Sequence, residues 1–365
     1  MRKKIFIYLG LLLLSFFFLP FPHQAFGGTL SKEDEKEVAL GKKVCEQVEK
    51  KWDRVVDPVR VARLEAILQR LAPEAQRPLE YEVRVISEDQ PNAFSLPGGY
   101  IYFTTGMLDF ARSDPELASI MAHEMVHTER KHAMIQSARN ERLSLLALAV
   151  AVASRGEAAA VIMANIAQVA ILNAYSRDLE KEADLGGLKM LNATGFPVSS
   201  AVTVMERLAE ERLKHPYVDP GVFLDHPDLP ERIGYMAAFI KNSGWPLHRK
   251  DPLRLLRTSI EEKDRRLLLR VDGKEVWSGP STEEVRSVMG VAKREIDRFL
   301  QMELLPSDIS VERDEKGLLL RVGRGVVVRQ NDLPEGMSSL ETFSESLRKS
   351  VVEAQRAHPM GRYLL

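Results

Sequence analysis

The chain has 365 residues, of which 45% are hydrophobic and 28% are charged, so it is long enough for two domains of roughly 100–200 residues each and too apolar to be disordered. Its 51 basic and 52 acidic residues leave a net charge of -1, which excludes a chain whose overall field attracts nucleic acid. Cys45 is the single cysteine, which excludes a scaffold of disulfides within the chain.

Residues 1–27 have the pattern of a secretory signal peptide. A basic start precedes an uncharged apolar run over residues 5–19, which is shorter than the roughly 20 residues that a membrane span needs. Ala25 and Gly27 are small residues at the positions that signal peptidase reads, so we predict cleavage after Gly27. The alternative is an uncleaved membrane anchor. Cleavage predicts an exported, mildly acidic protein that is periplasmic or otherwise extracytoplasmic.

Residues 31–104 are predicted to form two helices and then three short strands. Ser31 can cap the first helix, and Pro58 stands in the first turn of the second. Apolar and charged residues alternate over the first strand, and the turn Pro97-Gly98-Gly99 joins the other two. The predicted strands are residues 79–85, 92–96 and 100–104.

A helix-rich stretch follows. Ser113-Asp114-Pro115 supplies the capping side chain and the first-turn proline that open a helix. Two alanine-rich apolar segments, residues 143–154 and 158–172, are each too short to span a membrane, so we predict buried core helices in a hairpin. A further helix is predicted over residues 180–191.

The composition changes after Trp245-Pro246, and strands then alternate with helices. We predict strands at residues 267–271, 276–277, 309–312, 318–322 and 326–329, and helices at residues 281–300 and from about residue 338. No repeat of about 30–50 residues is recognised, so a solenoid of helical repeats is not indicated. Gly323-Arg324-Gly325 is predicted to be a β-turn rather than a dinucleotide loop. The predicted domains are therefore residues 28–247 and a smaller α+β domain, residues 248–365, of unknown role.

His123-Glu124-Met125-Val126-His127 is an H-E-x-x-H sequence inside the helix that Pro115 opens. Residues i and i+4 lie about 40° apart around a helix, so both imidazoles can reach one metal ion. Glu124 lies roughly 60° from His127, where it can take a proton from a water at that metal. The alternative is a surface helix with two stray histidines. His132 points about 140° away from His127 and is predicted to be solvated.

Glu180 and Asp184 share one face of the predicted helix over residues 180–191. If this face is buried, the two acids need a counter-charge, which a dication and the N–H of a ligating imidazole would supply. On spacing alone an acidic, solvated face is an equally good interpretation, because Lys181 and Glu182 are adjacent.

Four short blocks, in order over about residues 33–240, resemble the HtpX-like and CAAX-prenyl-endopeptidase family of zinc metallopeptidases, in its secreted soluble branch. The blocks are Asn92 to Gly99, His123 to His127, Ser176-Arg177 with Glu180 and Ala183-Asp184, and Leu224-Asp225-His226-Pro227 followed by Glu231-Arg232-Ile233. The resemblance implies a mainly helical, gluzincin-type α+β domain with a small β-sheet beside the active-site helix.

The resemblance also implies roles for single residues. One Zn²⁺ per chain would be bound by His123, His127 and Glu180, with Glu124 as general base and later acid. The remaining implied roles fall to Asp184, which would orient a ligand histidine, to His226, which would stabilise the oxyanion, and to Arg232, which would hold the His226 loop or add positive charge. Without the other blocks, His226 would be interpreted as an ordinary loop histidine before a proline.

Asn92, Ala93 and Phe94 lie where the family keeps an edge strand, so a substrate peptide is expected to pair there by β-augmentation. Two features depart from the family: residues 248–365 look α+β where helical repeats are common, and Asp225 replaces a small hydroxyl residue. A peripheral membrane contact and a protein partner of residues 248–365 stay open.

The sequence therefore predicts a zinc metalloendopeptidase that hydrolyses peptide bonds of exported, misfolded or unassembled proteins. One alternative is a chaperone-like binding protein with a zinc-stabilised fold. It has no use for Glu124 as a base beside the metal. The other alternative is a membrane-anchored processing peptidase, which would keep residues 5–19.

Overall fold

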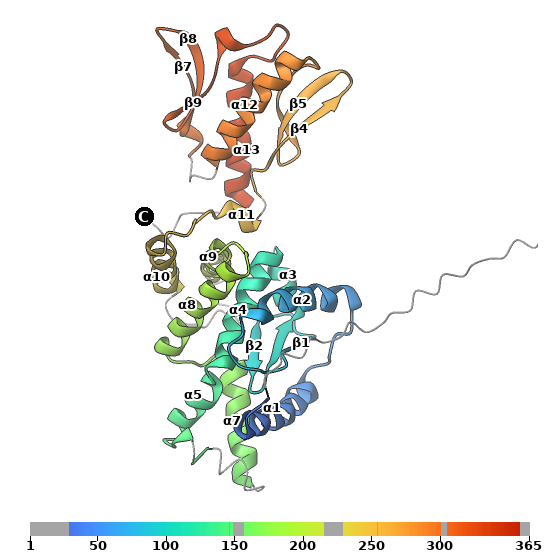
Figure 1. Ribbon diagram of the computed structural model, residues 1–365, viewed down its shortest axis with the longest axis vertical. Coiled ribbons are helices and arrows are strands. Elements are labelled where there is room, and N and C mark those ends of the chain that lie inside the picture. The colour runs from blue at the N-terminus through green and yellow to red at the C-terminus, as the bar shows by residue number, and fades with distance from the viewer. Residues whose placement is uncertain are drawn as a thin grey trace, which may run out of the picture.

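The computed structural model describes residues 29–357 except residues 112, 146, 149–156, 215–228, 254 and 301–304. The predicted signal peptide and His226 therefore lie outside the described residues. Within them the chain forms an α+β protein in which helices predominate and three small sheets are distributed between an N-terminal and a C-terminal body (Figure 1).

The N-terminal sheet has the order β1-β3-β2 and is made of β1 (Glu82–Ile86), β2 (Ala93–Leu96) and β3 (Tyr100–Thr104). β1 runs parallel to β3, and β2 runs antiparallel to it, so β2 is an edge strand, as the resemblance implied. β1 begins at Glu82 rather than at Leu79. The turn between β2 and β3 needs glycine, because Gly98 and Gly99 have φ of 87° and 102°.

Nine helices of the described chain surround this sheet. They are α1 (Lys32–Lys51), α2 (Pro58–Leu71), α3 (Thr105–Phe110), α4 (Asp114–Glu129), α5 (His132–Asn140), α7 (Glu157–Ile171), α8 (Arg177–Ala193), α9 (Ser199–Lys214) and α10 (Leu229–Asn242). The predicted caps are confirmed, since Ser31 accepts from the Asp34 amide and Ser113 accepts from the Glu116 amide.

The sheet separates two hydrophobic cores, because alternate side chains of a strand point to opposite faces. Val83, Ala93 and Phe103 enter the core that contains α2, α4 and α8–α10, whereas Phe94 and Tyr102 enter the core that contains α1, α5 and α7. α4 is buried along nearly its whole length. This position accounts for the apolar residues around the histidines.

α7 confirms the second alanine-rich segment as a core helix packed on α5 and β2. The first segment lies mostly outside the described residues, which leaves the predicted hairpin untested. None of the helices in the described part of the chain combines the length and the apolar character that a membrane span needs.

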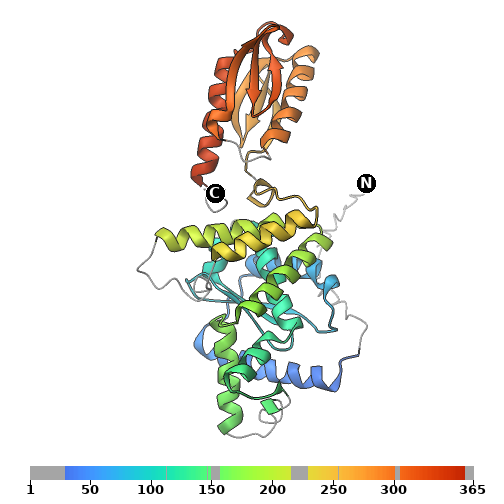
Figure 2. The same ribbon diagram turned by 90° about the vertical axis from the view of Figure 1, so that its left-hand side faces the viewer.

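After the short helix α11 (Lys250–Leu253) the C-terminal body consists of two β-β-β-α units in succession. The first unit is β4 (Thr258–Lys263), β5 (Arg266–Val271), β6 (Lys274–Pro280) and α12 (Glu283–Leu300), and the second is β7 (Ile309–Asp314), β8 (Gly317–Val322), β9 (Gly325–Arg329) and α13 (Leu340–Ala357). The elements predicted in this region are confirmed, β4 is additional, and Gly323 lies in a turn as expected. The units have one hydrophobic core in common, with the helices on opposite sides of the strands (Figure 2).

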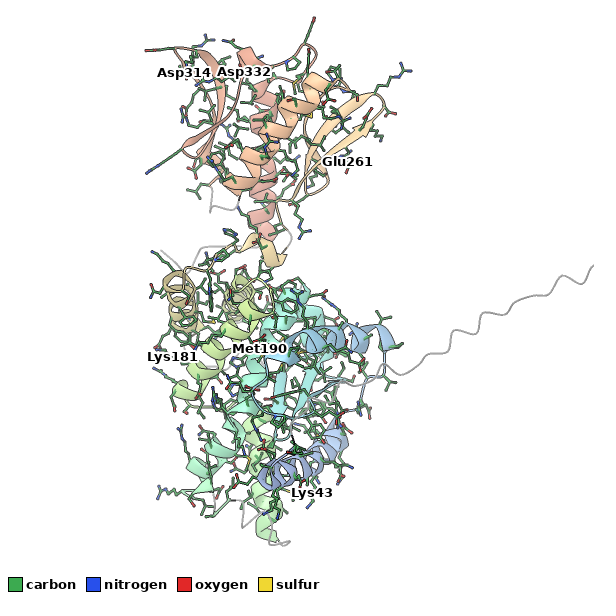
Figure 3. The ribbon with its side chains drawn as sticks, in the orientation of Figure 1. Lys43, Lys181, Met190, Glu261, Asp314 and Asp332 are labelled. Atoms are coloured by element: carbon green, nitrogen blue, oxygen red, sulfur yellow. The ribbon has the colours of Figure 1, made fainter. Side chains whose placement is uncertain are left out.

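This internal repeat was not recognised in the sequence, which showed no repeat of about 30–50 residues. Its units match in detail: Arg270 pairs with Glu261 of β4 at 2.9 Å, and Arg321 pairs with Glu312 of β7 at 2.8 Å. Both sheets also carry a β-bulge just before the paired arginine. Glu261 extends from the edge of its sheet (Figure 3). The sequence concealed the repeat because the identical residues are confined to short runs such as Leu-Leu-Arg-Val.

Candidate metal centre

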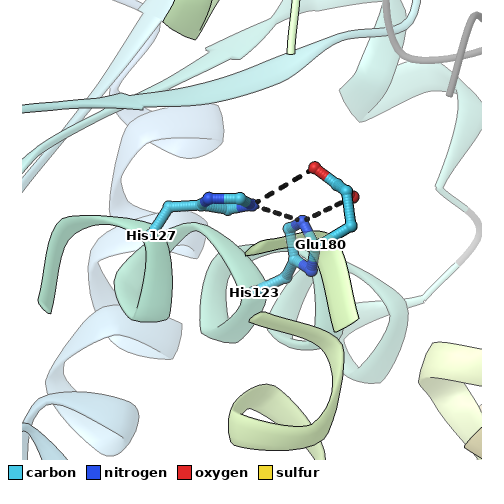
Figure 4. A group of neighbouring side chains, drawn as sticks. All are labelled: His123, His127 and Glu180. Atoms are coloured by element: carbon cyan, nitrogen blue, oxygen red, sulfur yellow. Dashed lines mark hydrogen bonds and ion pairs between the residues drawn. The ribbon is translucent and has the colours of Figure 1, made fainter. Parts of the chain in front are cut away.

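The two histidines of the H-E-x-x-H sequence face each other from consecutive turns of α4. Their Nε2 atoms lie 2.9 Å apart, and both side chains are buried, with 6% of His123 and 2% of His127 exposed. Ser113 and the proline at the first turn fix where α4 begins, and the helical period then places the two rings on one side (Figure 4).

Glu180 reaches the same point from α8. Its carboxylate oxygens lie 3.7 Å from Nε2 of His123 and 3.6 Å from Nε2 of His127, and the three possible ligand atoms are all within 4.8 Å of one another. Small residues allow this approach, because a Cβ on Gly187 would lie 3.3 Å from the His123 amide nitrogen. The structure thus brings together the three predicted ligands.

The outer ring nitrogens show that this donor set suits a zinc ion. Nδ1 of His123 lies 3.0 Å from Asp184 Oδ1, and Nδ1 of His127 lies 2.9 Å from Nδ1 of His132. When each Nδ1 carries the ring proton, both Nε2 lone pairs point at the same place, and a cation between them would remove their repulsion. Two neutral imidazoles and a carboxylate are a common ligand set of catalytic zinc, which keeps a fourth position open.

Glu124 is fully buried beside this group. Burial raises the pKa of its carboxyl to about 7, although His123 and a hydrogen bond from Ser95 act in the opposite direction. Ser95 Oγ donates this bond to Oε2 over 3.0 Å, and Oε1 is a buried atom with no partner among the described residues. A base with this pKa can accept a proton near neutral pH. The sequence did not predict a role for Ser95. The one signal for such a role is its position next to Phe94 in the predicted substrate strand.

Asp184 and Arg232 form a buried ion pair behind His123. Arg232 donates from Nε and Nη2 to Asp184 over 2.9 and 2.7 Å, and its Nη1 lies 2.9 Å from Glu180 Oε2. The Tyr235 hydroxyl also donates to Asp184. Burial opposes ionisation of Asp184, but Arg232 and His123 outweigh it and lower its pKa to about 2. The acidic-face alternative is therefore wrong, since both acids are 5% exposed.

Arg232 lies on α10, where it supports the ligands of the centre. The position of His226 is not described, so its oxyanion role stays a prediction.

In the predicted substrate strand β2, the peptide groups point alternately toward β3 and toward the free edge of the sheet. The Thr104 amide donates to the Asn92 carbonyl, so in an antiparallel ladder Asn92 and Phe94 bond to β3, whereas Ala93 and Ser95 face the free edge. Asn173 already reaches that edge and donates to the Ala93 carbonyl over 3.2 Å. The Phe94 ring stacks on a core tyrosine, which leaves main-chain groups rather than side chains for a substrate.

The prediction that His132 is solvated is wrong. Its side chain is fully buried against His127. The angle expected for a continuous helix does not apply, because α4 ends at Glu129 and Lys131 adopts a left-handed φ of 58° before α5 begins. Tyr175 was not singled out in the sequence. Its ring stacks on the His127 ring, with centroids 4.1 Å apart.

Comparison with known proteins adds a family match. The model of peptidase family M48 matches residues 58–238. A candidate beta-barrel assembly-enhancing protease of Vibrio cholerae serotype O1 is 34% identical over 161 residues, which are 40% of this chain and 32% of that protein. The beta-barrel assembly-enhancing protease of Escherichia coli O157:H7 is 27% identical over 214 residues, 56% and 43% of the two chains.

A mitochondrial protein is similar over a shorter region. The mitochondrial metalloendopeptidase OMA1 of Schizosaccharomyces pombe is 29% identical over 130 residues, which are 36% of this chain and 38% of that protein. The chain therefore spans less than half the length of each of these relatives.

Proposed function

We propose that this chain, which matches the model of peptidase family M48 over residues 58–238, is a zinc endopeptidase that cleaves exported, misfolded or unassembled proteins. The observation that carries the proposal is the convergence of His123, His127 and Glu180 on one point with Glu124 buried beside it. These residues come from α4 and α8, which pack closely against each other.

In this proposal His123, His127 and Glu180 hold the zinc ion, which when bound would polarise the scissile carbonyl and acidify a water. Glu124 takes the proton of the attacking water and then delivers it to the leaving amine. Burial favours the protonated form of this carboxyl and raises its pKa, which supports its role in carrying the proton to the leaving amine.

Two further residues have supporting roles in the proposal. Asp184, held by Arg232, lies 3.0 Å from Nδ1 of His123 and favours the ring proton on that nitrogen, which keeps Nε2 free for the metal. His226 donates to the oxyanion that develops during attack, as the resemblance of the Asp225-His226-Pro227 block implies. This second role is inferred from the sequence alone.

We also propose that the substrate is an extended segment of polypeptide that pairs with β2. The outward peptide groups of Ala93 and Ser95 would bind its main chain, and Asn173 would have to release the Ala93 carbonyl. Main-chain pairing discriminates little between side chains, so it favours unfolded segments of many proteins over one sequence.

An extracytoplasmic location, with a periplasmic one as the specific case, follows from the signal-peptide pattern of residues 1–27. Two relatives named for beta-barrel assembly enhancement support a role close to outer-membrane protein assembly. In this arrangement residues 28–247 are the peptidase domain. Residues 248–365 have a hydrophobic core of their own and are a separate domain. This second domain contacts a partner protein or a membrane surface.

The test compares Glu124→Gln with wild type, both produced without residues 1–27. The variant keeps the size of the side chain but cannot accept a proton, so it should retain one zinc per chain and lose cleavage of an unfolded test protein. Glu65→Gln, an exposed change on α2, is the control and should cleave normally. Near-normal cleavage by Glu124→Gln would reject the proposed base, and a wild type that binds but never cleaves would favour the chaperone-like alternative.

A further inference from the structure

His132 is the first residue of α5, and it contacts His127 on the Nδ1 side of that ring, away from the Nε2 atom that faces His123 and Glu180. Its ring is fully buried, and its Nδ1 lies 2.9 Å from Nδ1 of His127. The rings meet nearly edge to face, with planes 80° apart. No other imidazole of the described chain contacts a predicted ligand in this way from outside the H-E-x-x-H sequence.

The position of the protons follows from the two distances around His127. Its Nε2 faces Nε2 of His123 and the Glu180 carboxylate, so it must be unprotonated to bind a metal ion. A neutral imidazole has one N–H, which is then on Nδ1 of His127 and donates to His132. Nδ1 of His132 is therefore the acceptor, and the proton of that ring is on Nε2.

Glu182 agrees with this arrangement. Its Oε2 lies 3.4 Å from Nε2 of His132, where a carboxylate favours a protonated nitrogen. The other oxygen of Glu182 pairs with Arg130 over 3.2 Å, which keeps the carboxylate near the ring although its side chain is 49% exposed. The chain of contacts runs from Glu182 through His132 to His127.

Tyr175 restrains the same ligand in a second direction. Its ring stacks on His127 with planes 24° apart, so rotation of the imidazole out of this plane would cost that contact. His127 is thus held by a hydrogen-bond acceptor in its plane and by an aromatic ring on its face, whereas His123 is held by the carboxylate of Asp184.

We propose that His132 is a positioning residue that fixes the tautomer and the orientation of His127, so that Nε2 of His127 is presented to the metal. The inference rests on the metal site of the proposed function. In that site the neutral ring of His132 accepts from His127, whereas the carboxylate of Asp184 lies against His123. Loss of such a partner typically weakens metal binding by about 10–100-fold.

Two amide variants test the acceptor directly. In His132→Asn the side-chain oxygen can take the place of Nδ1, so zinc affinity should stay within about threefold of wild type. In His132→Gln the amide lies where Nε2 was, so zinc affinity should fall by about 10–100-fold. Affinity is measured by competition with a chromogenic chelator, and the visible spectrum of the cobalt-substituted proteins reports the ligand geometry independently of activity.

The comparison of the two amides separates positioning from packing. Both are polar and smaller than histidine, and asparagine is the smaller of the two, so loss of packing alone would weaken zinc binding in His132→Asn at least as much as in His132→Gln, and that result would overturn the inference. Equal, wild-type affinity in both variants would overturn it as well. Wild type and His123→Ala are measured alongside: if wild type binds no zinc, the proposed function itself fails, whereas a zinc-binding wild type with an unaltered His132→Gln rejects the role of His132 alone.

Discussion

The hydroxyl of Ser95, on the edge strand β2, donates a hydrogen bond over 3.0 Å to the carboxylate of Glu124, on α4. The contact joins the strand proposed to bind the substrate to the residue proposed to move the proton. The peptide group of Ser95 points toward the free edge of the sheet, and the side chain of Ser95 points toward Glu124. A peptide paired with β2 would therefore lie directly beside the base.

Ser95→Ala should raise the pKa of Glu124 further above its ordinary value. The hydroxyl donates to the charged carboxylate and so favours it, and its loss adds to the effect of burial, which already raises the pKa to about 7. The base must be deprotonated to act, so kcat/KM should fall most below pH 7 and recover as pH rises. The measurement is kcat/KM from pH 5 to 9. Ser200→Ala, a buried serine on α9, is the control, and an unmoved acid limb would contradict the role of Ser95.

His123→Ala should abolish tight binding of zinc, because it removes one of three protein ligands and leaves Glu180 and Arg232 to pair without the metal. Metal content by mass spectrometry should fall from about one zinc per chain to near none. His248→Ala changes a partly exposed histidine outside the centre and should keep the metal. Full occupancy in His123→Ala would reject the ligand assignment.

His226→Ala should lower kcat by on the order of 10²–10³-fold at unchanged zinc content, because an oxyanion donor acts mainly in the transition state. Single-turnover cleavage of a fluorogenic peptide, with zinc quantified in the same sample, measures both quantities. A variant more active than wild type would instead mean that His226 keeps the enzyme latent, and an unchanged rate would remove His226 from the site.

Asp34→Asn should lower the stability of the N-terminal body at neutral pH by about 1–2 kcal/mol. Burial raises the pKa of Asp34, but its hydrogen bonds with Arg77 and Ser31 outweigh that effect and lower the pKa to about 2. The stabilisation is present above the ordinary pKa of 3.8 and is lost as pH falls toward 2. Urea unfolding of variant and wild type should therefore differ at pH 7 and converge between pH 4 and pH 2.5. A constant difference would contradict the assignment.

Local features of the sequence were enough to predict one half of the centre. His123, Glu124 and His127 lie within five consecutive residues of one capped helix, and helical geometry alone fixes their relative directions. The same reasoning found β2 and β3, whose turn requires glycine. Such predictions succeed because every contact involved is between near neighbours in the chain.

The other half depended on how distant segments pack. Glu180 reaches the histidines only because glycines let α8 approach α4, and Ser95 reaches Glu124 only because β2 lies against α4. His132 was misplaced for a related reason: one left-handed residue, Lys131, ends the periodicity on which the prediction relied. The sequence by itself therefore determined the chemistry of the α4 helix, while tertiary packing decided which side chains complete it, because burial and long-range contacts depend on the whole fold rather than on spacing.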